Sequence, residues 1–178
     1  MEPGSWHHAT RFVSPTVGPV DLDVVLRDIA EEAKREAAEP LSVCIGTDSE
    51  EIGDGVKFVT AVVLRRERRG ARFYAYSDTD PTLLLRDRRG AERFRERIYR
   101  EVMMTATLAA EVRGVLGEVF DGLLPAGLEV HADVGESGSS SQILGQVIGI
   151  LKGYGFAEQE IFIKPNAYAA STVADRAI

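Results

Sequence analysis

The sequence predicts one α/β domain built on a five-stranded mixed sheet with helices on its faces. Five apolar segments separated by turn residues are typical of strands, and two longer segments carry apolar residues at helical spacing. Each of the last two strands follows a predicted helix, which favours parallel crossover connections. With 178 residues, 44% of them hydrophobic, the chain is long enough to build one full core.

The N-terminal part divides into an arm and a helix. Residues 1–20 carry proline and glycine without periodicity, so we expect an arm preceding a single domain at 21–178. The segment from Asp21 to about Ala38 has apolar residues close to helical spacing and stops before Pro40. It predicts an extra N-terminal helix.

Three strands are expected next, at Leu41–Asp48, Val56–Arg65 and Arg72–Ser77. Short polar turns containing glycine connect them, so they should form an antiparallel meander.

The second half of the chain alternates helices and strands. A long helix is predicted over about Gly90–Glu118, because apolar residues recur there every three or four positions. A fourth strand ends at Asp133, a helix covers about Ser140–Lys152, a fifth strand covers Glu160–Lys164, and a short helix ends the chain. From Leu41 onward the expected order is therefore β-β-β-α-β-α-β-α.

Composition and charge narrow the classes of function. One cysteine, Cys44, excludes an intrachain disulfide and favours a reducing, cytoplasmic setting, and no segment is typical of a membrane span. The formal net charge is −7, yet residues 65–100 hold twelve of the twenty-one basic residues, all arginine, against six acids. This window is either a solvated surface or a basic lip that holds nucleic-acid phosphates beside an acidic site.

Four acidic residues stand where a metal site would need them. Asp48 and Asp133 each end a predicted strand, Glu101 lies on the apolar stripe of the long helix, and Asp175 falls in the last helix. A carboxylate is costly to bury alone, so their placement on apolar elements indicates a shared cation. If the first and fourth strands are neighbours, Asp48 and Asp133 meet at the sheet edge.

Two of these residues have purely local alternatives. Glu101 stands three positions after Ile98, so it projects toward the sheet, unless it reaches solvent or pairs with Arg97 on the same helix. The segment Thr172-Val-Ala-Asp175 fits a helix-capping pattern, which competes with a ligand role for Asp175.

The donor types indicate which metal to expect. Four carboxylates without cysteine or histidine suit Mg²⁺ or Mn²⁺ rather than zinc. Carboxylates from four elements can bridge two such ions, an arrangement used for hydrolysis of phosphodiesters.

Three segments carry a resemblance to a known family. Ile45-Gly-Thr-Asp-Ser49, Val130-His-Ala-Asp-Val-Gly135 and Ile163-Lys-Pro-Asn-Ala-Tyr-Ala-Ala-Ser171 with Ala174-Asp-Arg176 resemble the YkuK family, a bacterial ribonuclease H-like group also called a domain of unknown function. The resemblance runs from about Asp21 to the C-terminus. It implies a ribonuclease H-like fold with Asp48, Glu101, Asp133 and Asp175 as catalytic metal ligands. Asn166 departs from the family, in which aspartate is frequent at that position.

Three further residues are candidates for substrate binding, and the sequence leaves two alternative functions open. Ser49, Lys164 and Tyr168 are candidates for substrate binding, against local hydrogen bonding, solvent exposure and core packing as their respective alternatives. The first function is a metal-dependent nuclease acting on RNA, an RNA–DNA hybrid or structured DNA. The second is a catalytically silent module that binds nucleic acid or a protein partner through the arginine-rich window.

Overall fold

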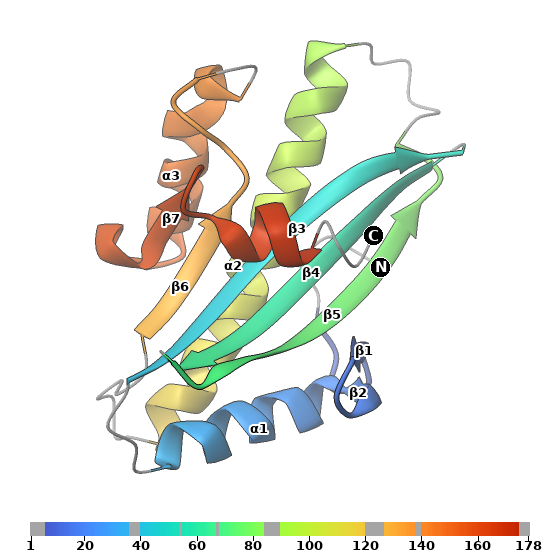
Figure 1. Cartoon of the computed structure of the whole chain (residues 1–178). Helices are drawn as coiled ribbons and strands as arrows, with labels where there is room; N and C mark the ends of the chain where they lie inside the picture. The colour runs from blue at the N-terminus through green and yellow to red at the C-terminus, as the bar shows by residue number, and fades with distance from the viewer. Residues whose placement is uncertain are drawn as a thin grey trace.

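The fold is organised around one mixed β-sheet of seven strands. The computed structural model describes residues 6–35, 40–53, 55–66, 68–83, 90–119, 127–137 and 140–174. Within them the strand order is β2-β1-β5-β4-β3-β6-β7 (Figure 1). The strands are β1 (Arg11–Ser14), β2 (Gly18–Asp21), β3 (Leu41–Ile52), β4 (Gly55–Arg66), β5 (Gly70–Asp80), β6 (Gly127–Ala132) and β7 (Ile161–Ile163).

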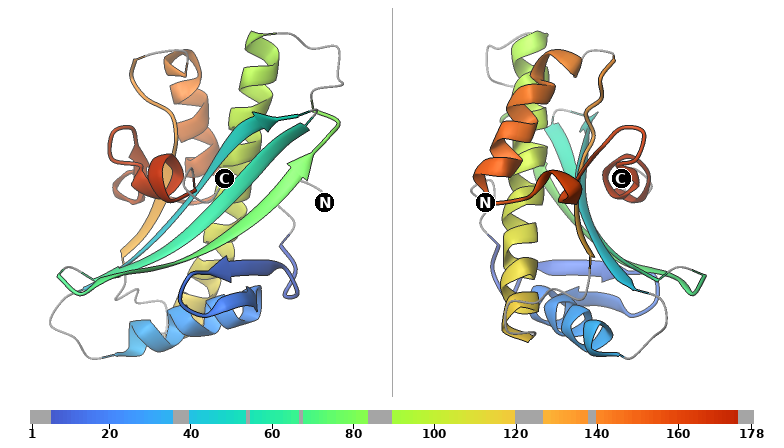
Figure 2. Two further views of the ribbon diagram at one scale, coloured as in Figure 1. Left: turned by 45° about the vertical axis from the view of Figure 1, so that its right-hand side comes forward. Right: turned by 90° about the vertical axis from the view of Figure 1, so that its left-hand side faces the viewer.

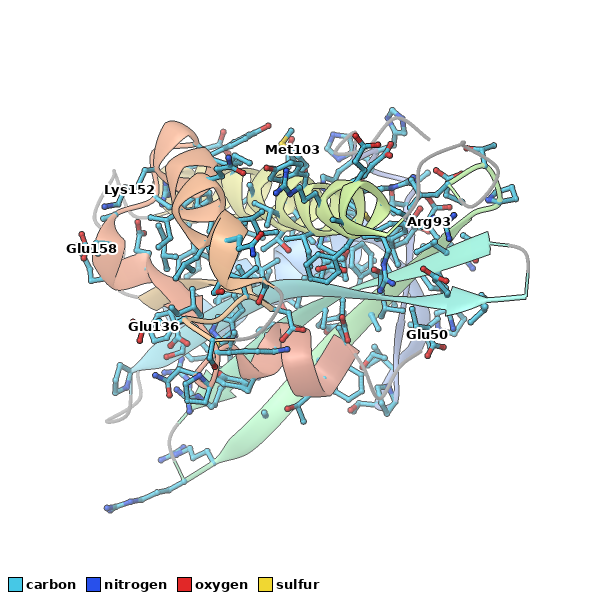
Figure 3. All side chains as sticks on the ribbon, turned by 90° about the horizontal axis from the view of Figure 1, so that it is seen from above. Glu50, Arg93, Met103, Glu136, Lys152 and Glu158 are labelled. Atoms are coloured by element: carbon cyan, nitrogen blue, oxygen red, sulfur yellow. The ribbon has the colours of Figure 1, made fainter. Side chains whose placement is uncertain are left out.

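Helices cover the two faces of the sheet unequally. The α-helices α1 (Leu22–Lys34), α2 (Ala91–Val119) and α3 (Leu144–Gly153) pack on one face, and a short π-helix, η3 (Ala169–Ala174), lies on the other (Figure 2). Seen from above, α2 and α3 run over one side of the sheet, with the labelled Met103 and Lys152 on that side (Figure 3). Two 3-10 turns, η1 (Ser141–Ile143) and η2 (Glu158–Glu160), precede α3 and β7.

The apolar periodicity of the sequence explains the main core. The predicted stripe of the long helix is buried on α2, where Ile98, Val102, Val112 and Leu116 face the sheet. These side chains meet alternate residues of β3, including Val43, because successive strand residues point to opposite faces. The predicted long helix is therefore confirmed, with bounds one residue later than expected.

Strand pairing agrees with the predicted meander and crossovers. β3 pairs antiparallel with β4, β4 pairs antiparallel with β5, and β6 runs parallel to both β3 and β7. The first and fourth predicted strands, now β3 and β6, are therefore neighbours. This pairing decides where the acidic residues meet.

The prediction of five strands was wrong, because the sheet has seven strands within the described residues. The two extra strands, β1 and β2, come from the segment expected to be an arm. β1 pairs with β2 and reaches the sheet at Val13, opposite Ala75 of β5. Phe12 is fully buried beside Trp6 and Tyr76. Strands of four residues are too short to show a clear alternation in sequence, and only their packing on β5 reveals them.

The expected end of the first strand was also wrong. β3 continues for four residues beyond Asp48, to Ile52. β6, however, pairs with β3 only as far as Ala132, opposite Thr47. Asp48 is therefore the first residue of β3 beyond the end of its parallel neighbour, and Asp133 follows Ala132 directly. The strand is longer than predicted, yet the two acids still face the same edge.

Candidate functional site

Asp48 and Asp133 come together through strand register. Each follows a residue of the last β3–β6 pair, Thr47 and Ala132, so they occupy equivalent places on neighbouring strands. The backbone N–H of Ser49 donates to Asp48 Oδ1 at 2.8 Å. Because β6 ends here, side chains from both faces of the sheet can approach this edge.

Glu101 reaches the same edge from α2 and is almost completely buried, at 4% exposure. The Ser49 hydroxyl donates to Glu101 Oε1 at 2.6 Å. Burial raises the pKa of Glu101 from 4.5 to about 8; the Ser49 hydrogen bond lowers it, Asp48 raises it, Arg97 lowers it and Asp133 raises it. The Asp48 and Asp133 carboxylates are therefore close enough to Glu101 to disfavour its negative charge.

Asp133 retains an oxygen that a cation could use. Lys164 Nζ lies 2.8 Å from Asp133 Oδ2, whereas Asp133 Oδ1 is buried and has no hydrogen-bond partner among the described residues. A buried carboxylate oxygen without a donor is costly. Asp48 and Glu101 supply further carboxylate oxygens near this edge, and oxygen donors of this type are the ligands that hard divalent cations prefer. In residue type, these side chains fit such an ion.

Arg97 donates hydrogen bonds to Ser49, beside Glu101. Its Nε donates to Ser49 Oγ at 3.1 Å and its Nη2 donates to the Ser49 carbonyl oxygen at 2.5 Å. Its Nη1 also lies 3.5 Å from Glu51 Oε1. Arg97 is thus occupied by β3, and it acts on Glu101 through Ser49 and through its charge rather than by direct pairing.

Asp175, the fourth predicted ligand, lies outside the described residues. The residue before it, Ala174, belongs to a small buried cluster with Val59 and Ala61 of β4. Val59 is the direct cross-strand partner of Asp48. Paired residues of neighbouring strands share a face of the sheet, so η3 ends on the face to which Asp48 points.

The three residues predicted to bind substrate have different surroundings. Ser49 is buried between Arg97 and Glu101, as described above. Lys164 pairs with Asp133 but leaves about half of its side chain exposed, at 49%. Tyr168 packs its ring edge-on against His131 at 4.8 Å, with the Arg65 guanidinium 5.3 Å from the ring centre. Of the three, Lys164 is the residue that combines proximity to the carboxylates with exposure.

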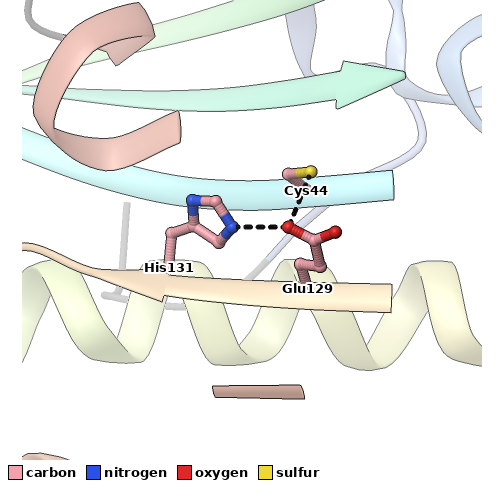
Figure 4. A group of neighbouring side chains, drawn as sticks. All are labelled: Cys44, Glu129 and His131. Carbon is pink, nitrogen blue, oxygen red and sulfur yellow. Dashed lines mark hydrogen bonds and ion pairs between the residues drawn. The ribbon is translucent and has the colours of Figure 1, made fainter. Parts of the chain in front are cut away.

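A second polar cluster, formed by Cys44, Glu129 and His131, was not assigned a role from sequence (Figure 4). Cys44 Sγ donates to Glu129 Oε2 at 3.3 Å, and His131 Nε2 lies 3.1 Å from the same oxygen. The bond from His131 holds the pKa of Glu129 below its usual range, against the effect of burial. Cys44 and Glu129 are register partners on β3 and β6, so strand register was the signal that would have brought them together.

The hydrogen bonds of His131 argue against a metal ion at this cluster. The three ligand atoms lie within 4.8 Å of one another, a separation that a metal could bridge. The backbone N–H of Ala169, however, donates to His131 Nδ1 at 3.0 Å, so the proton of the neutral ring is on Nε2. A metal on Nε2 would require an imidazole without any N–H. We therefore interpret the three residues as a hydrogen-bonded network.

The described arginines of the arginine-rich window fall into separate groups, on α2 and beside the β4–β5 turn. Arg100 pairs with Asp78 and Asp80 at the end of β5, whereas Arg66 and Arg72 lie beside the β4–β5 turn. Asp78 lies six residues along β5 from Arg72, and Asp80 lies ten residues from Gly70, so the groups are about 20–33 Å apart at a strand rise of about 3.3 Å per residue. The residues 84–89 of this window lie outside the described part of the chain.

The arginines beside the β4–β5 turn are paired with acids of α1. Arg66 Nε donates to Glu32 Oε1 at 2.9 Å, and Arg72 Nη1 lies 2.5 Å from Asp28 Oδ1. A cavity of about 410 Å³ between α1 and this turn is lined by both arginines and by Glu32. These arginines therefore attach the meander to α1, in addition to any role at the surface.

No helix in the described ranges has the length and apolar character needed to cross a membrane.

Comparisons with known proteins agree with the resemblance expected from the sequence. The family model described as ribonuclease H-like matches residues 24–178. The chain is 28% identical over 168 residues to the uncharacterized protein YkuK of Bacillus subtilis (strain 168), covering 88% of this chain and 92% of that protein. No solved structure matches the chain.

Proposed function

The chain belongs to the ribonuclease H-like family, and from this premise we propose that it hydrolyses phosphodiester bonds of nucleic acid with Mg²⁺ or Mn²⁺. The proposed ligands are Asp48, Glu101, Asp133 and Asp175. The observation that carries the proposal is the convergence of Asp48 and Asp133 on the buried Glu101 carboxylate. Such a group of carboxylates is unfavourable in its fully ionised form unless a cation joins it.

The residues of the proposed site have different roles in the proposed reaction. Bound divalent ions, two in the arrangement we propose, would activate a water and stabilise the leaving oxygen. Asp48, Glu101 and Asp133 would hold the ions at the end of β6, and Ser49 orients Glu101 through its hydrogen bond. Lys164, half exposed beside Asp133, is placed to bind a phosphate of the substrate.

The arginines of α2 favour the proposal of a nucleic-acid substrate, because they lie on the same side of the molecule as the carboxylates. Arg93, labelled in Figure 3, lies toward the same end of the view as Glu50 of β3. Arg97 and Arg100 follow on the same helix and are attached to β3 and β5 respectively. Because Arg97 and Arg100 are paired with Glu51, Asp78 and Asp80, their charge offsets only part of the repulsion between the carboxylates and a polyanion.

The test is hydrolysis of labelled RNA, RNA–DNA hybrid and branched DNA with and without Mn²⁺, for the wild-type protein and for Asp48→Asn. We expect Mn²⁺-dependent cleavage that Asp48→Asn reduces at least about a hundredfold, because it removes a charged ligand. Glu50→Gln is the matched control, since Glu50 is exposed and lies two residues along the same strand.

Two results would contradict the nuclease. Cleavage that survives in Asp48→Asn would place the activity elsewhere or in a contaminant. Binding of nucleic acid without Mn²⁺ and without turnover would instead favour the catalytically silent binding module.

A further inference from the structure

The cavity between α1 and the β4–β5 turn is rich in arginine. Figure 1 shows α1 running past this end of the β4–β5 hairpin. The cavity has a volume of about 410 Å³, within the range of about 300–1,000 Å³ that small-molecule sites occupy. One acid, Glu32, lines it together with four arginines, which are Arg35, Arg66, Arg69 and Arg72. Its size therefore suits a small ligand, and its charge indicates an anion.

The acids beside these arginines balance only part of their charge. Glu32 Oε1 accepts from Arg66 Nε at 2.9 Å, and Glu32 Oε2 accepts from Arg35 Nη1 at 3.1 Å. Arg72 bonds Asp28, which is not part of the lining. Within the described residues, four guanidinium groups thus stand against the carboxylates of Glu32 and Asp28. Attachment of the hairpin to α1 needs only as many arginines as acids, so the two additional positive charges favour a site for an anion.

The cavity also has an apolar side, formed by Leu41 and Leu64. Leu41 stands directly opposite Arg66 on β4, and Leu64 stands directly opposite Arg72 on β5. Paired residues of neighbouring strands share a face of the sheet, so each of these arginines has a leucine beside it. A ligand in the cavity meets guanidinium groups and apolar side chains together. This combination suits an organic anion better than an inorganic one.

The cavity is separate from the carboxylate site. Asp48 pairs with Val59 on β4, and Arg66 lies seven residues further along that strand. At a rise of about 3.3 Å per residue, this separation is about 23 Å. A small ligand in the cavity therefore does not reach the cations of the proposed nuclease, and the inference does not rest on the proposed function.

We propose that this cavity binds a small phosphate monoester, with the phosphate among the arginines and the organic part against Leu41 and Leu64. A phosphate monoester carries a charge of about −1.5 to −2 at pH 7, which matches the two arginines in excess of the acids. The planar guanidinium group pairs with two phosphate oxygens at once. The monoester is either a free small molecule or the phosphorylated end of a nucleic-acid strand.

The four arginines differ in how far they are committed to the fold. The Arg66 side chain is 9% exposed and bonds Glu32, and Arg72 is attached to Asp28. The Arg35 side chain is 70% exposed at the end of α1, and Arg69 is exposed in the turn. Arg35 and Arg69 are therefore the residues to change, because loss of Arg66 or Arg72 would also loosen α1.

The test is calorimetric titration of adenosine 5′-monophosphate into the full chain, in a phosphate-free buffer with EDTA to exclude divalent ions. Wild type should bind, and Arg35→Met and Arg69→Met should each bind at least about tenfold more weakly, because each loses charge-assisted hydrogen bonds. Arg68→Met is the matched control, since Arg68 is exposed in the same turn but lines a different hollow. It should bind within about twofold of wild type, and thermal melts verify that all variants fold.

Leucine methyl NMR locates the ligand. Addition of adenosine 5′-monophosphate should shift the signals of Leu41 and Leu64, and it should leave that of Leu151, buried on α3, unchanged. No binding by wild type, or shifts that spare Leu41 and Leu64, would overturn the site. An equal loss of affinity in Arg68→Met would also overturn it, because the attraction would then be a general effect of surface charge.

Other ligands identify what the cavity recognises. Inorganic phosphate should bind at least about tenfold more weakly than adenosine 5′-monophosphate, because it makes no contact with the leucines. Equal binding would overturn the role of the apolar side. A 5′-phosphorylated RNA tetranucleotide that binds more tightly, and that depends on Arg35 and Arg69, would identify a strand end as the source of the monoester. Equal binding of the unphosphorylated tetranucleotide would overturn recognition of a monoester.

Discussion

The hydroxyl of Ser49 donates a 2.6 Å hydrogen bond to Glu101 Oε1, and this contact joins β3 to α2 beside Asp48. Ser49 Oγ at the same time accepts from Arg97 Nε. The Ser49 hydroxyl therefore accepts a hydrogen bond from the positively charged guanidinium and donates one to the buried carboxylate. The bond lowers the pKa of Glu101, yet burial outweighs it and keeps that pKa at about 8. Glu101 is therefore protonated in a large fraction of the metal-free protein at neutral pH.

Glu101→Gln should stabilise the metal-free protein at high pH. The pKa of Glu101 is about 8 when folded and near 4.5 when unfolded, so its contribution is fully present below about pH 4.5 and is lost as pH rises through 8. Glutamine does not ionise, so the variant does not lose this stability as the pH rises. We expect the free energy of unfolding of Glu101→Gln to exceed that of wild type by a margin that grows from about pH 5 to pH 9, to on the order of a few kcal/mol.

Urea titrations across this pH range measure the margin. Glu92→Gln is the control, because Glu92 is exposed in the first turn of the same helix. Addition of Mn²⁺ should make wild type more stable than Glu101→Gln, because the bound ion stabilises wild type and the variant lacks a charged ligand. A margin independent of pH would show that Glu101 stays ionised in the metal-free protein.

Lys164→Met should strengthen Mn²⁺ binding. Lys164 Nζ lies 2.8 Å from Asp133 Oδ2, so it competes with a cation for that carboxylate. Removing one positive charge from the site should raise Mn²⁺ affinity roughly threefold to tenfold in calorimetry. Lys152→Met is the matched control, because Lys152 pairs with Glu158 at 3.1 Å on the surface of α3. Weaker binding in Lys164→Met would mean that Lys164 supports the metal site instead of competing for it.

Arg66→Met should destabilise the fold more than Arg68→Met. The Arg66 side chain is 9% exposed and donates to both the carboxylate and the carbonyl oxygen of Glu32, whereas Arg68 is exposed in the turn. Leaving Glu32 without this partner should cost about 2–4 kcal/mol in urea unfolding, against less than about 0.5 kcal/mol for Arg68→Met. Equal losses would indicate that Arg66 is a surface residue available to bind nucleic acid.

Cys44 should be inert in the folded protein. Burial raises the pKa of its thiol to about 12, with a smaller lowering by the Tyr168 hydrogen bond and a smaller raising by the Glu129 charge. Its reaction with a disulfide reagent at pH 8 should be slower than in the unfolded chain by at least roughly a thousandfold, because the thiolate is the reactive form. The same sample in guanidinium chloride provides the reference rate. Fast labelling of the native protein would show that the network around η3 opens readily.

The sequence by itself determined the elements that repeat with a clear period. The apolar stripe of α2 and the apolar runs of β3 and β4 appear directly in the order of residues, because local geometry sets the helical period and turn residues bound the strands. The acids at the ends of the β3–β6 pairing were found for the same reason. Glu101 was recognised because a carboxylate on an apolar stripe has to be buried with a partner, and its burial is confirmed.

Only the tertiary structure decided the features that depend on register and on contacts between distant segments. β1 and β2 are too short to show a period, and they became strands because β5 offers an open edge to Val13. The network of Cys44, Glu129 and His131 requires β3 and β6 to be aligned so that Cys44 faces Glu129, a register that no local pattern specifies. The tautomer of His131 was set by an N–H thirty-eight residues away, because η3 folds back onto the sheet.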